Sequence, residues 1–193
     1  MKKNLLISIL MTIVTTVLLG VIYPLVVTGL AQLLFHDKAN GQLITRNGTM
    51  IGSKIIAQPF TGAGYFHPRE SAAGTNGYDP TSSGGTNFAA TNKKLIDRVD
   101  ADVQAFHAEN PSAPIPADMV TASASGLDPD ITPANAYFQV PRIAKARGVS
   151  EDQLRSLVAA HIQGRDLGLL GEPRVNVLEL NLALDQATAR ASQ

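Results

Sequence analysis

Hydrophobic positions are continuous at the start of the chain, and no polar face interrupts them. No formally charged residue lies between Lys3 and Asp37. A bilayer core of about 30 Å needs about 20 apolar helical residues. The pattern therefore predicts one transmembrane helix with a core at residues 6–27, which can continue to residue 35. We assign residues 1–36 to a membrane anchor, because a soluble surface helix would show a polar stripe.

A cleaved signal peptide is the competing interpretation of this segment. Lys2 and Lys3 suit either reading, but the apolar region of a signal is usually about 7–15 residues and ends at a small-residue site. Here the apolar run continues well past that length without a polar cleavage region. We therefore favour an uncleaved anchor. A kink is expected at Pro24, because proline lacks the amide hydrogen that a helix uses.

The charges that flank the anchor predict its orientation. Lys2, Lys3 and the terminal amine favour a cytoplasmic N-terminus. Lys38 and Arg46 follow the apolar run and make the difference small. Long domains are translocated largely regardless of their charge. We therefore expect residues 37–193 to form one domain on the extracytoplasmic side.

Short alternating runs and turn signals follow the anchor. Two β-prone runs at residues 43–46 and 49–52 flank Asn47-Gly48. This dipeptide is a strong hairpin signal, because both turn positions need a positive φ. The pattern predicts a β-hairpin whose second strand can extend through residues 54–57.

The stretch from Gln58 to Asn92 has almost no periodic apolar pattern and is rich in Gly, Ser, Thr and Asn. Loops of this length are usually functional or disordered. Several aromatic rings argue for order, because disordered segments contain few of them. We predict an ordered loop that is held in place by Tyr65, Phe66, Tyr78 and Phe88.

Helical periodicity returns after this loop. Apolar residues at i, i+4, i+8 and i+11 predict a helix at residues 93–109 that is capped by Thr91 or Asn92. A second helix is expected to begin at Pro133 after a Thr132 cap, and Pro141 is expected to kink or divide it.

Four further elements complete the predicted domain. Ser150 and Gln153 form a capping box that opens a helix at Glu151. Short strands are expected at residues 119–122 and 175–178, and a terminal helix is slightly preferred at residues 180–187. The resulting fold class is α+β, with a single N-terminal transmembrane helix followed by one small mixed α/β domain.

Composition narrows the function classes. Sixteen basic residues balance 16 acidic residues, so neither a nucleic-acid partner nor an acidic tail is expected. The chain has no cysteine, which excludes disulfides, thiolate metal sites and a cysteine nucleophile. Without Lys2 and Lys3 the exported part is slightly acidic, which favours cations weakly.

Ser82–Asn87, which reads SSGGTN, is the first candidate for chemistry. Consecutive glycines can present backbone N–H groups to an anion. A Walker loop would need a lysine after the last glycine, and none follows Gly85 at that distance. A tight turn with hydroxyl groups bonded to its own backbone is the favoured alternative. Direct nucleotide binding through Ser83, Gly84, Gly85 and Asn87 stays open.

The other polar candidates are weaker. Asp128 and Asp130 could grip a hard cation, but calcium needs six or more oxygen ligands, so a structural role is favoured. Arg69 could pair with Glu70 or Asp79. A triad of Ser83, His67 and Asp128 can be assembled only on paper, because no nucleophile elbow is present. The histidines lack metal-ligand spacing, and no metal site or catalytic residue is expected.

The order of these motifs resembles a known family. A basic N-terminus, one membrane helix, the hairpin after Asn40-Gly41, and SSGGTN are followed by two specific segments. They read TASASGLDPDITP and GEPRVNVLELNLALD, at residues 121–133 and 171–185. The chain resembles the C subunit of the Kdp potassium-transporting ATPase of bacteria from its anchor to near Leu184, which is almost its whole length.

The resemblance implies a non-catalytic accessory subunit of an ATP-driven potassium pump in the bacterial inner membrane. The implied partners are a potassium-selective channel-like subunit, a P-type ATPase subunit, a small single-helix subunit and membrane lipid. The family is also described as a catalytic chaperone that raises the ATP affinity of the catalytic subunit. ATP and potassium would be used by the complex, and no cofactor is assigned to this chain itself.

We expect the domain to be periplasmic and to lie at the outer ion entrance. There it would stabilise the assembly through the loop at residues 60–88 and the turn at residues 126–132. The residues expected on this surface are Tyr65, Phe66, Arg69, Tyr78, Ser83, Asn87, Asp128 and Asp130.

Overall fold

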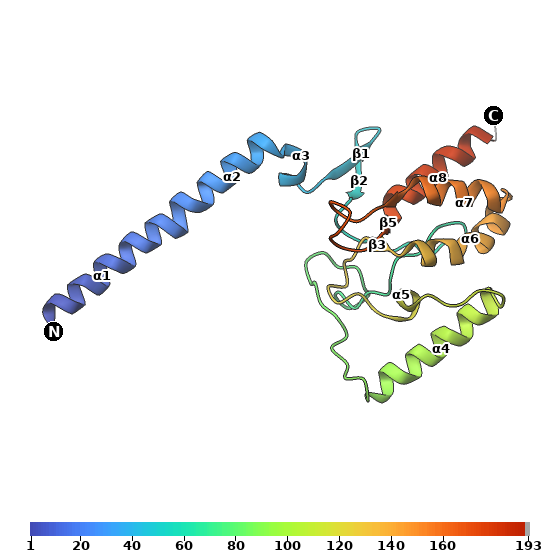
Figure 1. The fold of residues 1–193 in the computed structure, drawn as a ribbon, viewed down its shortest axis with the longest axis horizontal. Coiled ribbons are helices and arrows are strands. Elements are labelled where there is room, and N and C mark those ends of the chain that lie inside the picture. The colour runs from blue at the N-terminus through green and yellow to red at the C-terminus, as the bar shows by residue number, and fades with distance from the viewer. Residues whose placement is uncertain (192–193) are drawn as a thin grey trace. The chain divides into compact units, whose positions relative to one another are not determined.

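The structure is a computed structural model that describes residues 1–191, and its elements are labelled in Figure 1. Contacts divide the chain into two compact units, one of which comprises Met1–Ile51 while the other begins at Gly52. The class is α+β with one long N-terminal apolar helix and a β-hairpin, which confirms the predicted fold class.

The first unit begins with one long apolar helix. It comprises α1 (Lys2–Val17), a π-helical segment (Leu18–Ile22) and α2 (Tyr23–Leu34). At 33 residues it is long and apolar enough to cross a membrane. A rise of about 1.5 Å per residue gives it a length of about 50 Å, which exceeds the hydrocarbon thickness of about 30 Å.

Pro24 acts through the π-helical segment that precedes it. The N–H of Tyr23 donates to the carbonyl of Leu18, five residues earlier. This wider turn lies where the missing amide of Pro24 would otherwise break the regular pattern. Three hydroxyl groups in α1 bond to carbonyls of the preceding turn, as an apolar environment requires. They belong to Ser8, Thr12 and Thr15.

A short helix and the hairpin follow. The backbone breaks at Phe35, and α3 spans His36–Ala39. Strands β1 (Leu43–Arg46) and β2 (Thr49–Ser53) flank Asn47 and Gly48, both of which have positive φ. The predicted hairpin is confirmed. Its extension through residues 54–57 is wrong, because Ser53 accepts the amide of Ile55 and begins a turn.

The second unit places a peripheral helix beside its core. Helix α4 (Lys93–Glu109) begins at Asn92, whose side chain accepts the amide of Lys94, as the sequence predicted. The predicted strand at residues 119–122 is wrong, because residues Ala117–Val120 form the short helix α5. The hydroxyl of Thr121 bonds back to the carbonyl of Ala117 and closes this turn.

A small antiparallel sheet organises the core. Its strands are β3 (Asp130–Ile131), β5 (Arg174–Asn176) and β4 (Ile162–Gln163), in that spatial order. Val175 in β5 faces Ile131 on one side and Ile162 on the other. Val177 and Leu178, expected in this strand, instead begin α8, because Asn176 accepts the amide of Glu179 and caps the helix.

Three helices complete the core, two of them packed against β5 and the third packed against those two helices (Figure 1). They are α6 (Pro133–Arg147), α7 (Glu151–Ala160) and α8 (Val177–Ala191). Pro141 does not divide α6, because Val140 and Ile143 on either side of it are buried and packing holds both halves in place. The core residues include Phe66, Ile131, Val140, Ile143, Leu154, Val158, Val175, Leu180 and Leu184.

Candidate functional site

The aromatic part of the long loop is fixed to the core by two side-chain amides. The N–H of Phe66 donates to Asn181 Oδ1 at 2.9 Å, and Asn181 Nδ2 donates back to the Phe66 carbonyl at 2.9 Å. Gln139 makes the same paired contacts with the backbone of His67, at 2.8 and 3.1 Å. The Phe66 side chain is fully buried, so it is an anchor and its expected place on the contact surface is corrected.

Tyr65 is anchored to residues of α6 and α8. Its ring lies 4.4 Å from the guanidinium carbon of Arg147, and its hydroxyl donates to Asp185 at 3.3 Å. Arg147 and Asp185 form an ion pair at 2.8 Å. Phe88 is 38% exposed and does not anchor the loop as predicted.

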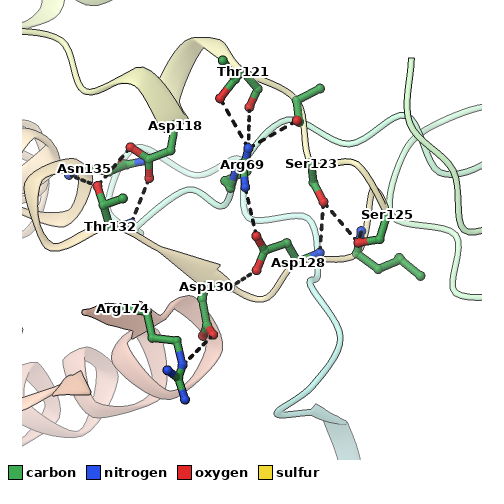
Figure 2. A network of polar contacts seen from close by, with 12 residues as sticks. Arg69, Asp118, Thr121, Ser123, Ser125, Asp128, Asp130, Thr132, Asn135 and Arg174 are labelled. Carbon is green, nitrogen blue, oxygen red and sulfur yellow. Dashed lines mark hydrogen bonds and ion pairs between the residues drawn. The ribbon is translucent and has the colours of Figure 1, made fainter. Parts of the chain in front are cut away.

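Arg69 lies at the centre of a polar network (Figure 2). Its Nη1 donates to Asp128 Oδ2 at 3.0 Å. Its Nη2 donates to the hydroxyl of Thr121 and to the carbonyl of Ala122, both at 3.3 Å. Arg69 therefore joins the loop after Phe66 to the segment at residues 121–128.

The predicted partners of Arg69 are wrong. Glu70 pairs with Arg98 of α4, and Asp79 accepts hydrogen bonds from the hydroxyl and amide of Thr81. These hydrogen bonds lower the pKa of Asp79. The partner of Arg69 is 59 residues away in the sequence, so local spacing could not identify it.

Tyr78 fixes the next part of the same loop. Its hydroxyl donates to the carbonyl of Arg69 at 2.8 Å, and burial raises the pKa of this phenol. Its amide donates to Ser71 Oγ at 2.8 Å. Ser71 in turn donates to the carbonyl of Gly126 at 2.5 Å, which is a second link to the segment at residues 121–128.

Asp128 and Asp130 both serve the fold. Asp128 Oδ1 accepts the amide of Asp130 at 3.1 Å. Asp130 pairs with Arg174 at 3.3 Å and accepts from Asn176 at 3.2 Å. Burial raises the pKa of Asp130, and the neighbouring Asp128 charge adds to this. Among the described residues no group of three or more His, Cys, Asp or Glu side chains could hold a metal ion.

Asp118 completes this network, and the sequence analysis missed it. Its carboxylate accepts the amide and hydroxyl of Thr132 at 2.8 and 3.0 Å and Nδ2 of Asn135 at 3.0 Å (Figure 2). It therefore fixes the start of α6 beside a cleft of about 340 Å³ that Arg69 and Asp130 also line. Asp118 is too far from the Thr132 cap in the sequence for a local pattern to have predicted the contact.

The glycine-rich stretch packs tightly against the same segment. Ser83 Oγ and the amide of Gly84 both donate to the carbonyl of Ser125 at 2.9 Å. A side chain at Gly85 would meet the carbonyl of Ala124 at 2.7 Å, so only glycine allows this approach. Asn87 follows with a φ of 53° and an exposed side chain. The amide of Gly84 is used inside the domain, in agreement with the tight-turn reading.

We call residues 69–87 and 121–132 the loop assembly, because these two segments are joined by the contacts above. Gly126 lies where the two segments approach each other closely. It has a φ of 68°, and an added Cβ would lie 2.7 Å from the Cβ of Ala73 and from the carbonyl of Gly84. The loop assembly is thus a single ordered surface without helix or strand over most of its length.

Ser83, His67 and Asp128, which were considered as a possible catalytic triad, do not form one. His67 Nε2 contacts the carbonyl of Gly62 at 3.0 Å, whereas Ser83 and Asp128 bond to Ser125 and Arg69. Burial, with the charge of Arg142, lowers the pKa of His67. No hydrogen bond joins any two of the three triad residues in the described chain.

Together these features define a class of protein. Its members have an apolar helix that is long enough to anchor in a membrane, and this helix is joined to a small domain with an ordered polar surface. The family model of the K⁺-transporting ATPase c chain matches residues 5–186. The chain belongs to this family, which confirms the resemblance seen in its motifs. As a c chain it is a membrane subunit of the ATPase complex and is not the catalytic subunit.

Relatives of similar length agree with this assignment. The chain is 67% identical over 185 residues to the potassium-transporting ATPase KdpC subunit of Koribacter versatilis, with coverage of 96% of this chain and 95% of the relative. It is 59% identical over 180 residues to the KdpC subunit of Acidobacterium capsulatum, with coverage of 93% and 96%. It is 54% identical over 188 residues to the KdpC subunit of Methylobacterium nodulans, with coverage of 91% of this chain and 92% of the relative.

Proposed function

We propose that the second unit of this subunit lies outside the cytoplasm, on the outer mouth of a potassium-selective partner subunit. The loop assembly would be the contact surface that stabilises the complex and shapes ion entry. The observation that carries the proposal is the fixed geometry of two irregular segments, linked through Arg69, Asp128 and Gly126. Ordered loops on a rigid scaffold are a common basis for recognition.

The surface that supports contact consists of side chains and backbone held at fixed positions. Carboxylates and exposed carbonyls at such a surface would raise the local concentration of cations. Phe66 is omitted because it is buried. The proposed contact residues are Arg69, Tyr78, Ser83, Asn87, Asp128 and Asp130 of the loop assembly, together with Tyr65 from the chain that precedes it.

An effect on ATP affinity would then be indirect. A subunit that binds one conformation of its partner more tightly shifts the equilibrium between conformations without touching the nucleotide. The anchor helix is the part of this chain that would reach the cytoplasmic side. Direct nucleotide binding by Ser83–Asn87 is the alternative, and the first experiment below distinguishes it from the proposed extracytoplasmic role.

The first experiment determines the side of the membrane. The chain has no cysteine, so Ala105→Cys on the exposed surface of α4 provides a single reactive thiol. An impermeant thiol reagent added to intact cells that express the chain alone should label it. Labelling only after permeabilisation would place the domain in the cytoplasm and favour the nucleotide-binding alternative.

The second experiment tests the accessory role. A complex that contains only residues 1–36 of this chain is compared with the complex of the full chain. We expect poorer assembly and a weaker apparent affinity for potassium when the domain is missing. Unchanged transport affinity and unchanged stability of the purified complex would contradict the proposal.

A further inference from the structure

The loop between β4 and β5 ends in three exposed leucines. Leu167, Leu169 and Leu170 are 91%, 82% and 62% exposed. Other leucines of this unit, such as Leu180 and Leu184, are buried in the core. A cluster of large apolar side chains in water is unfavourable, and on a folded protein it usually marks an interaction site.

The loop that presents these leucines is well ordered. The amide of Asp166 donates to the carbonyl of Leu170 at 2.8 Å, and the amide of Leu170 donates back at 2.9 Å. The amide of Gly168 donates to Arg165 at 3.1 Å. Leu167 has a φ of 54°, a costly conformation for a residue with a side chain. The backbone that carries these side chains is thus fixed before contact, which reduces the entropy lost on binding.

Ion pairs close the base of the loop. Arg165 pairs with Glu172 at 2.8 Å, and Arg174 lies 3.8 Å from Asp166. Each basic residue between positions 165 and 174 therefore has an acidic partner. The result is an apolar tip above a base of balanced charge.

This charge pattern favours a protein partner over a lipid surface. Segments that bind the surface of a membrane typically combine apolar residues with an excess of basic groups and with interfacial aromatic rings. Residues 165–174 have two Arg, one Asp, one Glu and no aromatic residue. Apolar anchors within a polar rim are instead the usual centre of a protein interface.

We propose that Leu167, Leu169 and Leu170 form an apolar knob that docks into an apolar pocket on another protein subunit of the same ATPase. Such a partner exists because the chain belongs to a family of ATPase subunits. The knob is a contact separate from the loop assembly. It does not depend on the loop assembly being a contact surface, and either one can fail without the other.

The first test replaces the knob in the full-length chain. Leu167→Ser, Leu169→Ser and Leu170→Ser are combined, and retention of the other subunits is measured on the affinity-tagged chain after solubilisation in detergent. We expect the affinity of the chain for the other subunits to fall about tenfold or more, as is usual when anchor residues of an interface are lost. Ile55→Ser, which replaces an apolar residue outside the knob with 52% exposure, is the control and should leave retention unchanged.

Folding of the triple variant is checked separately. The knob side chains are exposed, so thermal unfolding of the chain in the same detergent should match that of the wild type. Retention equal to that of the wild type, or an equal loss in the Ile55→Ser control, would overturn the proposal.

The second test needs no loss of the knob. A photo-activated cross-linking amino acid replaces Leu169 in cells that make the whole complex. The proposal predicts an adduct with an identified subunit of the purified ATPase. Adducts with lipid alone would show that the knob inserts into the membrane, and an absence of protein adducts would likewise overturn the proposal.

Discussion

The core and the loop assembly belong to the same unit but are stabilised by different interactions. In the core, α6, α7 and α8 bury aliphatic side chains with β5, and stability comes from apolar burial and close packing. In the loop assembly, Arg69, Ser71 and Ser83 donate to backbone or carboxylate oxygens of the segment at residues 121–128. The core tolerates change according to volume, whereas the loop assembly depends on individual donors, acceptors and glycines.

The largest loss of stability is expected from a substitution in the core. Leu180→Ala removes a fully buried side chain and leaves a cavity, so the free energy of unfolding should fall by about 2–5 kcal/mol. Urea unfolding of the full chain in detergent, followed by circular dichroism, measures this. Leu167→Ala at a site that is 91% exposed is the matched control, with an expected change within about 0.5 kcal/mol. Equal losses would show that Leu180 is not in the core.

The next largest effect is expected at Gly126, where the two segments of the loop assembly approach each other closely. Gly126→Ala combines a positive φ with a contact of 2.7 Å to the Ala73 Cβ, so we expect a loss of about 2–4 kcal/mol in the free energy of unfolding. Gly148→Ala at the end of α6 has a similar φ but open space around the added carbon. Its loss should be about 1 kcal/mol. Equal losses would mean that the two segments of the loop assembly are not in contact.

A smaller effect tests the ion pair at the centre of the loop assembly. Arg69→Leu leaves Asp128 half-buried without its cation and should lower the free energy of unfolding by about 1–3 kcal/mol. Arg155→Leu removes the exposed pair with Glu151 and should cost less than about 1 kcal/mol. Chemical unfolding of both variants measures the difference. No difference between them would contradict the role of Arg69 as a link.

The smallest effect depends on pH. Burial lowers the pKa of His67 from 6.5 in the folded state, so the unfolded state binds more protons below that pH. Stability should therefore fall as the pH decreases from about 7 towards 5, and His67→Gln should remove part of this fall. Thermal unfolding at both pH values, with and without the substitution, measures it. An identical pH dependence in the two proteins would contradict the assignment.

Local signals explain most of what the sequence predicted correctly. The caps at Asn92, Thr132 and Ser150 and the Asn47-Gly48 turn act over a few residues, and each formed as expected. The long apolar run formed the expected long helix. Errors arose where the apolar pattern was too short to decide, or where packing in the core overrides a local signal. The region of Met119 became helical, and Pro141 stayed inside α6 because of the buried residues around it.

The site was predictable in outline but not in its pairings. The sequence identified the two segments of the loop assembly, because both are polar, rich in turns and distinctive. It could not show that Arg69 pairs with Asp128, or that Asn181 and Gln139 bind the backbone of residues 66–67, since these partners lie 59 to 115 residues apart. Polar residues on otherwise apolar helix faces were the signal that could have revealed Asn181 and Gln139.

The most direct test of the loop assembly as a contact surface compares two cysteines in the complex. Ser83→Cys lies in the loop assembly and Ala105→Cys lies on α4, and both positions are exposed in the isolated chain. An impermeant reagent added outside should label both when the chain is alone. In the assembled ATPase we predict protection of position 83 and continued labelling of position 105, whereas equal labelling of both would contradict the account.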